Sequence, residues 1–309
     1  MKWVVLSDLH MNFKNCNTKI ARKKLIEQLK KENKESSISF IIITGDCFHQ
    51  NEGEANEISR FIAMLAKSCE IKKDKIILCP GNHDISRKDS DRNEKIQKYR
   101  NGGVLPNIEA CLEGYGKFRE LYSLVFARQY KPFTTKNINN FKIISIDSCL
   151  LSMDDKDHGQ LIVNFAELED LSEEIKKDNK INIVVMHHGV EWLQAEDGRR
   201  FQHWLADNNI RMVFCGHNHA PGMDILTEAI EPNSVPRDGI PQFTCGCTLS
   251  DSYSKPVFLV GEYTKTELFK MKLYEYRDDS NWAITSGILR SFPDGIYKES
   301  TTTGLIKNS

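Results

Sequence analysis

The sequence predicts an α/β fold with helices layered over β-sheets. Short runs rich in β-branched residues alternate with longer amphipathic stretches along most of the chain, and several of the short runs are apolar on both faces. Strands that are apolar on both faces occur where helices or a second sheet cover them. A chain of 309 residues, 40% of them hydrophobic, can also bury a large core without disulfide bonds.

The expected elements follow in chain order. The short apolar runs predict strands at residues 3–7, 39–44, 75–79, 142–147, 182–186 and 212–215. Apolar residues at three- and four-residue spacing predict helices at residues 19–33, 54–67, 107–127, 165–177 and 199–207.

The pattern changes after residue 219, where helical signals become rare. Runs at residues 242–245, 257–260 and 268–276 predict strands joined by turns, which we expect to complete a second sheet of a sandwich. Residues 293–309 have no periodicity. We therefore expect one domain over residues 1–292 and a loosely structured tail after it.

Composition limits the partners and the compartment. The 42 Lys and Arg residues nearly balance the 43 Asp and Glu residues, so any binding of nucleic acid must be local. The nine cysteines are odd in number and often lie in expected strands, which is typical of small buried side chains in a reducing compartment. No run of about 18 apolar residues is present, and the N-terminal apolar run is too short for a signal peptide. We expect a soluble cytoplasmic protein without membrane association.

Five polar clusters, most of them directly after an expected strand, carry the functional prediction. They are Asp8-Leu9-His10, Gly45-Asp46, Gly81-Asn82-His83-Asp84, His187-His188 and Gly216-His217-Asn218-His219. A lone Asp after a strand is usually a helix cap, and a lone His is usually a hydrogen-bonded polar residue. Five such clusters in order instead predict one rim of Asp, Asn and His donors, because ligands gather at the carboxyl ends of strands. This donor set suits a pair of divalent metal ions.

The five motifs resemble the signature of calcineurin-like metallophosphoesterases, which reads DxH, GD, GNHD, H and GHxH, over about two thirds of the chain. The resemblance implies a four-layered α/β/β/α sandwich with mixed sheets and a binuclear centre. Position by position, it implies that one ion is held by Asp8, His10 and His219. It implies that Asn82, His187 and His217 hold the other ion and that Asp46 bridges the two. Mn is the expected metal, with Fe, Zn, Ni or Co as alternatives.

The chemistry of such a site is metal-assisted hydrolysis of a phosphate ester. Two ions about 4 Å apart can share a bridging hydroxide and neutralise charge on the phosphoryl oxygens. His83 abuts the expected ligand Asn82 and is predicted to protonate the leaving oxygen, with Asp84 either orienting it or holding the loop. The alternative for His83 is a structural loop histidine. His188 either supports a ligand or packs in the core.

The second motif separates subfamilies. It continues as Gly45-Asp46-Cys47-Phe48-His49, which lacks the GDxxDRG run of serine/threonine phosphatases and resembles the GDxFH run of SbcD-type DNA-repair nucleases. That resemblance implies that His49 lies near the scissile phosphate, while an exposed histidine is the alternative. It also implies an ATPase as a possible protein partner. Residues 80–87 and 186–193 resemble metallophosphoesterase modules of bacterial signalling and antiphage defence proteins, which implies a defence-system component instead.

A cationic segment after the third motif bears on the substrate. Residues 86–102 carry six cations and three anions, and Arg87, Lys88 and Arg92 are predicted to bind phosphates beside the scissile one, unless this segment is a solvated loop. Trp192 could stack on a base or fill a core, and Arg199 and Arg200 are a weaker signal of substrate contact.

These observations predict a phosphodiesterase that acts on nucleic acid or a nucleotide, with a DNA nuclease favoured. A cyclic-nucleotide phosphodiesterase, a nucleotide phosphodiesterase and a phosphomonoesterase are the enzymatic alternatives. The alternative from another class is an effector or interaction module of a defence or signalling system, whose metal site is kept for structure.

Overall fold

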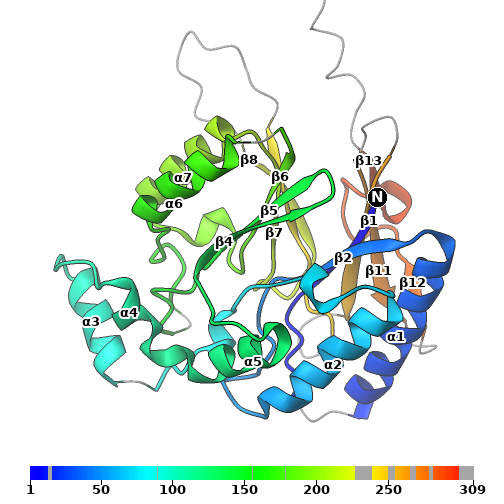
Figure 1. Ribbon diagram of the computed structural model, residues 1–309, viewed down its shortest axis with the longest axis horizontal. Helices are drawn as coiled ribbons and strands as arrows, with labels where there is room; N and C mark the ends of the chain where they lie inside the picture. The colour runs from blue at the N-terminus through cyan, green and yellow to red at the C-terminus, as the bar shows by residue number, and fades with distance from the viewer. Residues whose placement is uncertain are drawn as a thin grey trace, which may run out of the picture.

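The computed structural model describes residues 1–12, 16–88, 90–154, 156–177, 179–226, 239–249, 255–264, 269–277 and 281–298. Two mixed sheets pack face to face, and helices cover the outer face of each sheet (Figure 1). This arrangement confirms the predicted four-layered α/β/β/α sandwich.

The first sheet combines N-terminal parallel strands with C-terminal antiparallel strands. Its described strands, in spatial order, are β12 (Trp282–Ile284), β11 (Phe269–Tyr276), β10 (Val257–Tyr263), β1 (Lys2–Leu6), β2 (Ile38–Ile43) and β3 (Ile76–Leu78), with β13 (Ile296–Lys298) paired to β11. The strands β1, β2 and β3 are parallel, and β10 runs antiparallel to β1.

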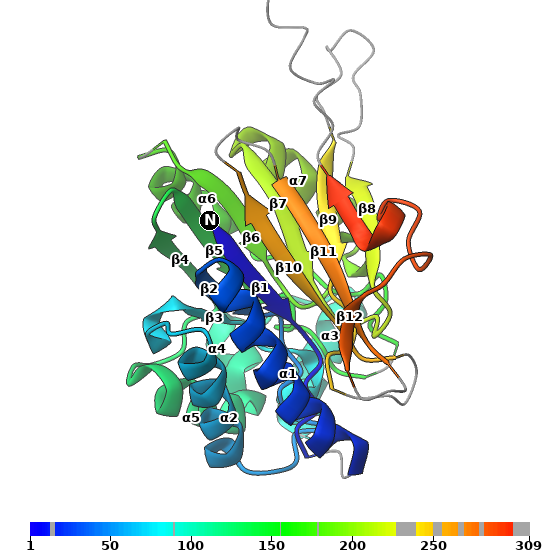
Figure 2. The same cartoon turned by 90° about the vertical axis from the view of Figure 1, so that its right-hand side faces the viewer.

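The second sheet lies behind the first in Figure 2. Its described strands, in spatial order, are β4 (Phe133–Ile138), β5 (Phe141–Ile146), β6 (Ile181–Val185), β7 (Ile210–Cys215), β9 (Ile240–Thr244) and β8 (Gly222–Leu226). The four central strands are parallel, and β4 and β8 are antiparallel edges.

The helices form the two outer layers. Figure 1 shows α1 and α2 over the first sheet, α5 beside α2, α6 and α7 over the second sheet, and α3 with α4 projecting at one end. Their bounds are α1 (Cys16–Glu35), α2 (Ala55–Ser68), α3 (Ser90–Arg100), α4 (Ile108–Cys111), α5 (Gly116–Phe126), α6 (Phe165–Ile175) and α7 (Ala195–Asp207). Short 3₁₀ turns cover Lys73–Lys75, Asn82–Asp84, Leu112–Tyr115, Val190–Trp192 and Pro293–Gly295.

An aromatic cluster joins the two sheets. Trp3 of β1 is completely buried, stacks on Phe40 of β2 with ring centroids 5.7 Å apart, and meets Phe141 of β5 at 5.6 Å. Gly261 of β10 lies against the Trp3 ring so closely that a Cβ there would collide with it. The packing of these rings fixes the distance between the sheets, and hence between the loops that follow their strands.

The expected strands and helices before residue 219 are all present, with shifted ends and with the helix expected at 107–127 broken into α4, a 3₁₀ turn and α5. The structure adds α3, which the sequence did not predict because this segment has few apolar residues to mark a period.

Two expectations about the C-terminal part are wrong. Its strands do not complete one sheet, because β9 joins the second sheet whereas β10 and β11 join the first. The loose tail does not begin at residue 293, because β13 pairs with β11. Strand pairing depends on a partner that is distant in sequence, so the local pattern could not reveal either fact. Residues 299–309 lie outside the described residues.

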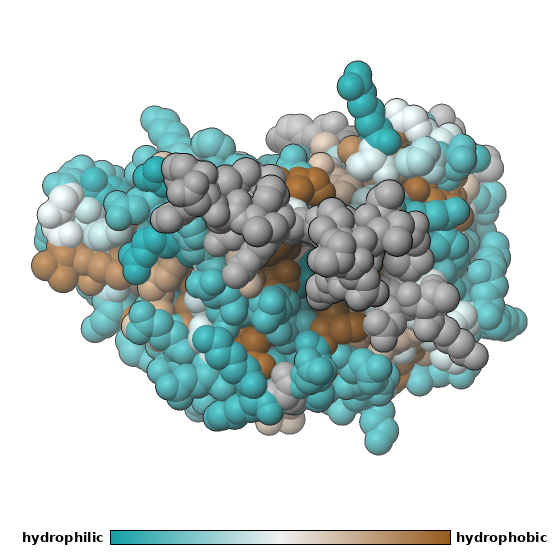
Figure 3. Space-filling view, turned by 90° about the horizontal axis from the view of Figure 1, so that it is seen from above, coloured by the Kyte–Doolittle hydropathy of each residue, from teal (hydrophilic) through white to brown (hydrophobic). Residues whose placement is uncertain are grey.

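The surface and the cysteines agree with an ordinary globular exterior and interior. Figure 3 shows hydrophilic residues over most of the described surface seen from above, with apolar residues in small groups.

Each cysteine whose side chain the structure describes is buried and outside any disulfide bond, and Cys247 donates to the Asp8 carbonyl oxygen at 3.0 Å. In the described ranges, no helix combines the length and the apolar character needed to cross a bilayer.

A buried carboxylate follows β5. Asp147 is completely buried and accepts hydrogen bonds from the Tyr130 hydroxyl at 2.8 Å, the Tyr115 hydroxyl at 3.2 Å and the Cys149 backbone N–H at 2.7 Å. Burial raises the pKa of Asp147 to about 6, although these three donors oppose the shift. The folded protein therefore holds a proton on Asp147 more tightly than the unfolded chain does.

Asp147 makes stability depend on pH. Because the pKa of Asp147 is raised in the folded protein, its contribution to the free energy of unfolding is present below about pH 4 and is lost as the pH rises through 6. From pH 4 to pH 7, we expect Asp147→Asn to gain about 2 kcal/mol of unfolding free energy relative to the wild type. Urea unfolding at both pH values measures this, with exposed Asp170→Asn on α6 as the control. A difference between Asp147→Asn and wild type that does not change with pH would contradict the raised pKa.

Candidate metal centre

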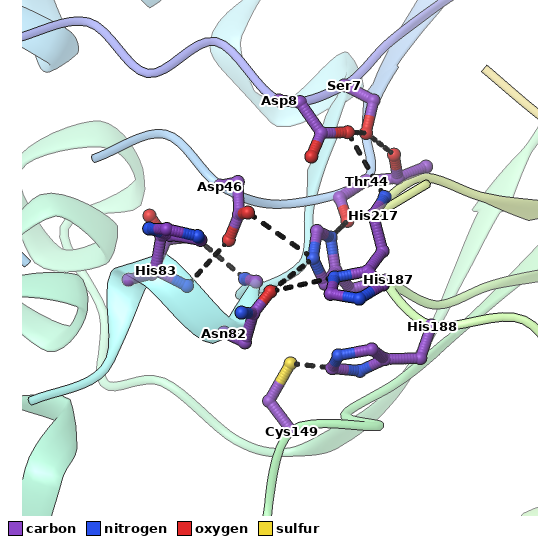
Figure 4. A network of polar contacts seen from close by, with 12 residues as sticks. Ser7, Asp8, Thr44, Asp46, Asn82, His83, Cys149, His187, His188 and His217 are labelled. Carbon is purple, nitrogen blue, oxygen red and sulfur yellow. Dashed lines mark hydrogen bonds and ion pairs between the residues drawn. The ribbon is translucent and has the colours of Figure 1, made fainter. Parts of the chain in front are cut away.

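The five sequence motifs occupy loops at one edge of the sandwich. Asp8 and His10 follow β1, Asp46 follows β2 and Asn82 follows β3, while His187 follows β6 of the other sheet. His217 and His219 follow β7. The sheets pack so that the carboxyl ends of their parallel strands meet here, and the labelled ligand candidates turn toward one another in Figure 4.

One cluster contains Asp8, His10, Asp46 and His219, which together could hold a metal ion. His219 Nε2 lies 3.2 Å from His10 Nε2 and 3.4 Å from Asp8 Oδ1. His10 Nε2 lies 3.9 Å from Asp46 Oδ2. These are the residues that the sequence assigned to the first ion and to the bridge.

The second cluster shares the Asp46 carboxylate with the first. Asn82 Oδ1 lies 2.9 Å from His217 Nδ1 and 3.0 Å from His187 Nε2. His187 Nε2 lies 3.5 Å from Asp46 Oδ2. One oxygen of Asp46 therefore lies between the two clusters, at the position that a bridging ligand would occupy.

The donor set fits a pair of divalent ions. Asp8 Oδ1 and Asp46 Oδ2 are buried and accept no hydrogen bond from the described residues. A buried carboxylate oxygen without a donor is costly, and a cation would compensate it. Burial and the Asp8 carboxylate raise the pKa of Asp46, whereas the neighbouring histidines outweigh burial and lower the pKa of Asp8. Two carboxylates lie in one small buried site, and the positive charge of a metal ion would stabilise their ionised forms.

Hydrogen bonds to the backbone orient the imidazole rings. His187 Nδ1 contacts the Thr44 carbonyl oxygen at 2.9 Å, and His10 Nδ1 contacts the Phe48 carbonyl oxygen at 3.0 Å. A carbonyl can only accept, so each ring carries a proton on Nδ1, and burial lowers the pKa of both rings, so that Nε2 faces the centre unprotonated. A neutral imidazole binds metal through its unprotonated ring nitrogen.

Strained backbone at the centre is a further sign of function. Five of the candidate ligands have positive φ: Asp8 at 50°, His10 at 40°, Asp46 at 52°, His217 at 68° and His219 at 57°. Such conformations cost energy in residues other than glycine and persist where the surroundings fix them. Gly81 is required for another reason, because a Cβ there would collide with the Asp46 carboxylate.

The sequence did not identify the polar residues behind Asp8. The Ser7 hydroxyl hydrogen-bonds the Asp8 carboxylate and is itself held by Thr44 Oγ1 at 2.6 Å. The His217 backbone N–H contacts the same Asp8 oxygen at 3.2 Å. Ser7 immediately precedes Asp8, and Thr44 lies two residues before Asp46. This position before a motif Asp is the only sequence signal for their role.

His83 lies on the wall of the site with a defined tautomer. Its backbone N–H donates to Asp46 Oδ1 at 2.7 Å, and its ring Nδ1 accepts from the Gln50 backbone N–H at 3.0 Å. Burial, with His10 and Arg87 nearby, lowers the pKa of His83 to about 2, so the ring is neutral and carries its proton on Nε2. The His49 ring stacks on it with centroids 5.3 Å apart. Both rings line the pocket, as predicted for residues that contact the substrate.

Asp84 and Arg92 are both buried. Asp84 accepts from the Phe48 and Gly81 backbone N–H groups, each at 2.8 Å, so it holds two motif loops together, which is one of the two roles predicted for it. Arg92 is completely buried and donates to the carbonyl oxygens of Cys111, Ser152 and Leu150 at 2.7, 2.7 and 3.0 Å. It cannot clamp a phosphate, and the prediction that it binds substrate is wrong.

His188 supports the site from the protein interior. It is completely buried, its Nδ1 lies 3.1 Å from Ser148 Oγ, and its ring packs on His217 with centroids 4.4 Å apart. Arg200 does not line the pocket, because its guanidinium lies over the Phe165 ring at 4.0 Å.

A pocket of about 610 Å³ opens beside the two clusters. It is lined by His49, Gln50, Asn82, His83, Arg87, Lys88, Asp154, Asp157, Trp192, His217, Asn218 and His219. Arg87 and Lys88 line this pocket, and their contact with a substrate stays a prediction. Trp192 lies in this wall, partly buried and packed against the edge of the core.

Comparison with known proteins agrees with this geometry. A family model described as calcineurin-like phosphoesterase matches residues 1–221. The relative "Uncharacterized metallophosphoesterase-like protein YydB" of Bacillus subtilis (strain 168) is 24% identical over 275 residues, which are 84% of this chain and 56% of the relative. The chain thus spans little more than half the length of that relative.

Solved structures share the fold at low identity. Purple acid phosphatase PPD1 from yellow lupin seeds superposes with a TM-score of 0.60 and 10% identity, covering 96% of this chain and 53% of that one. A dimetal phosphatase from Danio rerio gives 0.51 and 10% identity, covering 88% and 95%. Because the family model covers well over half of its length, the chain belongs to the calcineurin-like phosphoesterases, a family of metal-dependent phosphoester hydrolases.

Proposed function

We propose that the protein is a phosphodiesterase that hydrolyses nucleic acids or nucleotides, with DNA the favoured nucleic acid and Mn the favoured ion. The observation that carries the proposal is the composition of one pocket: two ligand clusters at its base, His83 on its wall and the cations Arg87 and Lys88 beyond them. The space past the clusters can hold the second substituent of a diester, and the cations suit a further phosphate. The resemblance to SbcD-type nucleases and defence modules adds a protein partner, an ATPase or a defence-system component, to the proposal.

The chain's own residues have separable tasks in this reaction. When bound, two divalent ions supply Lewis acidity and a water nucleophile at neutral pH. The water oxygen forms a bond to phosphorus while the bond to the leaving alkoxide breaks. His83 is neutral and carries its N–H at Nε2, so it can donate a hydrogen bond to the leaving oxygen, and that oxygen takes up the proton that the attacking water releases.

A hydrolysis panel tests the proposal. Protein loaded with Mn²⁺ is assayed on single- and double-stranded DNA and RNA, cyclic nucleotides, bis-p-nitrophenyl phosphate and p-nitrophenyl phosphate. We expect cleavage of DNA and of diesters, at least 100-fold weaker in Asp46→Asn, because that oxygen reaches both clusters. His203→Ala, on the exposed side of α7, is the matched control. Hydrolysis confined to the monoester would overturn the proposal, as would DNA cleavage that survives in Asp46→Asn.

A further inference from the structure

We propose that the pocket binds one nucleoside unit, with the base against Trp192 and the phosphates toward Arg87 and Lys88. The substrate is then a nucleotide diester or the end of a single strand, and not the interior of a duplex. This inference rests on the proposed function, because it names the unit that the same site accepts.

Trp192 is placed to form one wall of such a site. It ends the short turn Val190–Trp192, is partly exposed, and lines the pocket together with His217 and Asn218. Its ring meets the His217 ring edge-to-face with centroids 4.1 Å apart, directly beside a candidate metal ligand. An aromatic ring adjacent to the reacting phosphate is within reach of the base of the nucleotide that carries this phosphate.

A chain of polar contacts fixes the Trp192 ring before substrate arrives. Its Nε1 donates to Asn218 Oδ1 at 3.2 Å, and Asn218 Nδ2 donates to Glu191 Oε1 at 3.2 Å. Gln242 of β9 donates to Glu191 Oε2 at 3.0 Å and accepts from the Val190 backbone N–H at 2.9 Å. A side chain held in this way loses little conformational entropy when a ligand stacks on it. Packing alone does not require such a chain of hydrogen bonds to a partly exposed ring.

The other wall of the pocket is suited to phosphate. His83, Arg87 and Lys88 all lie in the segment that follows β3, and all three line the pocket. Arg87 Nε is 3.4 Å from the Asn82 carbonyl oxygen. Trp192 and these groups border neighbouring ligands of the second cluster, because Trp192 packs on His217, Arg87 contacts Asn82, and the two ligands lie 2.9 Å apart. The aromatic and the cationic side chains thus line one pocket beside the reacting centre.

The size and charge of the pocket favour a single unit over a duplex. About 610 Å³ is within the range of sites for small organic ligands, roughly 300–1,000 Å³. A duplex is bound along a track of cations, whereas this lining also contains the Asp154 carboxylate. Arg100 neutralises Asp157 at 2.6 Å and is therefore not free to extend a basic track.

Substrates with and without a base test the role of Trp192. The wild type is expected to cleave an oligonucleotide with a normal terminal unit faster than one with an abasic terminal unit. Trp192→Ala is expected to lower kcat/KM for the base-bearing strand by about 5- to 150-fold, since stacking contributes about 1–3 kcal/mol per base. The abasic strand has no base to stack and is expected to lose much less than the base-bearing strand, while circular dichroism and metal analysis show that the variant is folded and loaded. Trp192→Phe retains most of the preference because it keeps an aromatic face.

Three further arms separate the possible results. Linear single strands and mononucleotide diesters are expected to be cleaved, and covalently closed duplex DNA to remain intact; nicking of closed duplex at a comparable rate would overturn the inference. An equal loss on base-bearing and abasic strands would also overturn it, because Trp192 would then only position His217. Calorimetric binding of thymidine 5′-monophosphate and of deoxyribose 5-phosphate to the Mn-loaded protein needs no hydrolysis. A base-dependent affinity lost in Trp192→Ala without any diester cleavage would support the nucleoside site while rejecting the proposed function.

Discussion

Replacing His83 with alanine is expected to lower kcat/KM on DNA by about 10²- to 10³-fold, the usual effect of removing a hydrogen-bond donor from a developing negative charge. The reason is its tautomer: the Gln50 N–H occupies Nδ1, so the neutral ring presents its N–H at Nε2 inside the pocket. The loss is expected to be much smaller on bis-p-nitrophenyl phosphate, whose leaving phenolate is already stable as an anion. Measuring both substrates therefore tests hydrogen-bond donation to the leaving oxygen and not merely the presence of the ring.

Two controls make the His83 result interpretable. Alanine keeps the backbone N–H that holds Asp46, so metal content by elemental analysis is expected to stay at the wild-type value. His49→Ala removes the stacked neighbour without removing the donor. If His83→Ala slows both substrates equally, the ring stabilises the phosphoryl group and does not act on the leaving oxygen. An undiminished rate on DNA would remove His83 from the reaction altogether.

Replacing Arg92 with methionine is expected to lower the free energy of unfolding by about 3–5 kcal/mol. Methionine fills much of the space but leaves the carbonyl oxygens of Cys111, Leu150 and Ser152 without this donor in the interior. Arg92→Lys is expected to be nearly as destabilising, because an ammonium cannot reproduce the planar fork that reaches several carbonyls at once. Urea unfolding of the metal-free protein measures both changes.

Lys95→Met is the matched control for Arg92. Lys95 is on the same helix, but its partner Glu113 is at the surface, so the change is expected to stay within about 0.5 kcal/mol. Arg92 also fixes the carbonyls just after Ser148, which contacts His188 behind the second cluster. A stability of Arg92→Met close to that of the wild type would show that the loop finds other donors.

The sequence by itself determined the site motifs and most of the framework. Asp8, Asp46 and Asn82 could be placed at one rim because each follows a short apolar strand, and parallel strands bring their carboxyl ends together. The periodic helices were equally readable, since burial of one face imposes a regular spacing. The metal-binding role of these residues stays a prediction, now with a geometry that suits it.

Tertiary structure alone decided which charged and aromatic residues line the site. Arg87, Lys88 and Arg92 look alike in the sequence. Arg92 is buried because it hydrogen-bonds carbonyl oxygens of residues 111 and 149–152. No local sequence pattern indicates partners so far away in the chain. Trp192 is in the pocket because contacts to Asn218, and through Glu191 to Gln242, hold its turn there. Strand β13 exists only where β11 offers an edge. Local sequence sets periodicity and turns, whereas the partner of a buried cation, an exposed ring or an edge strand is set by the packing of segments far apart in the chain.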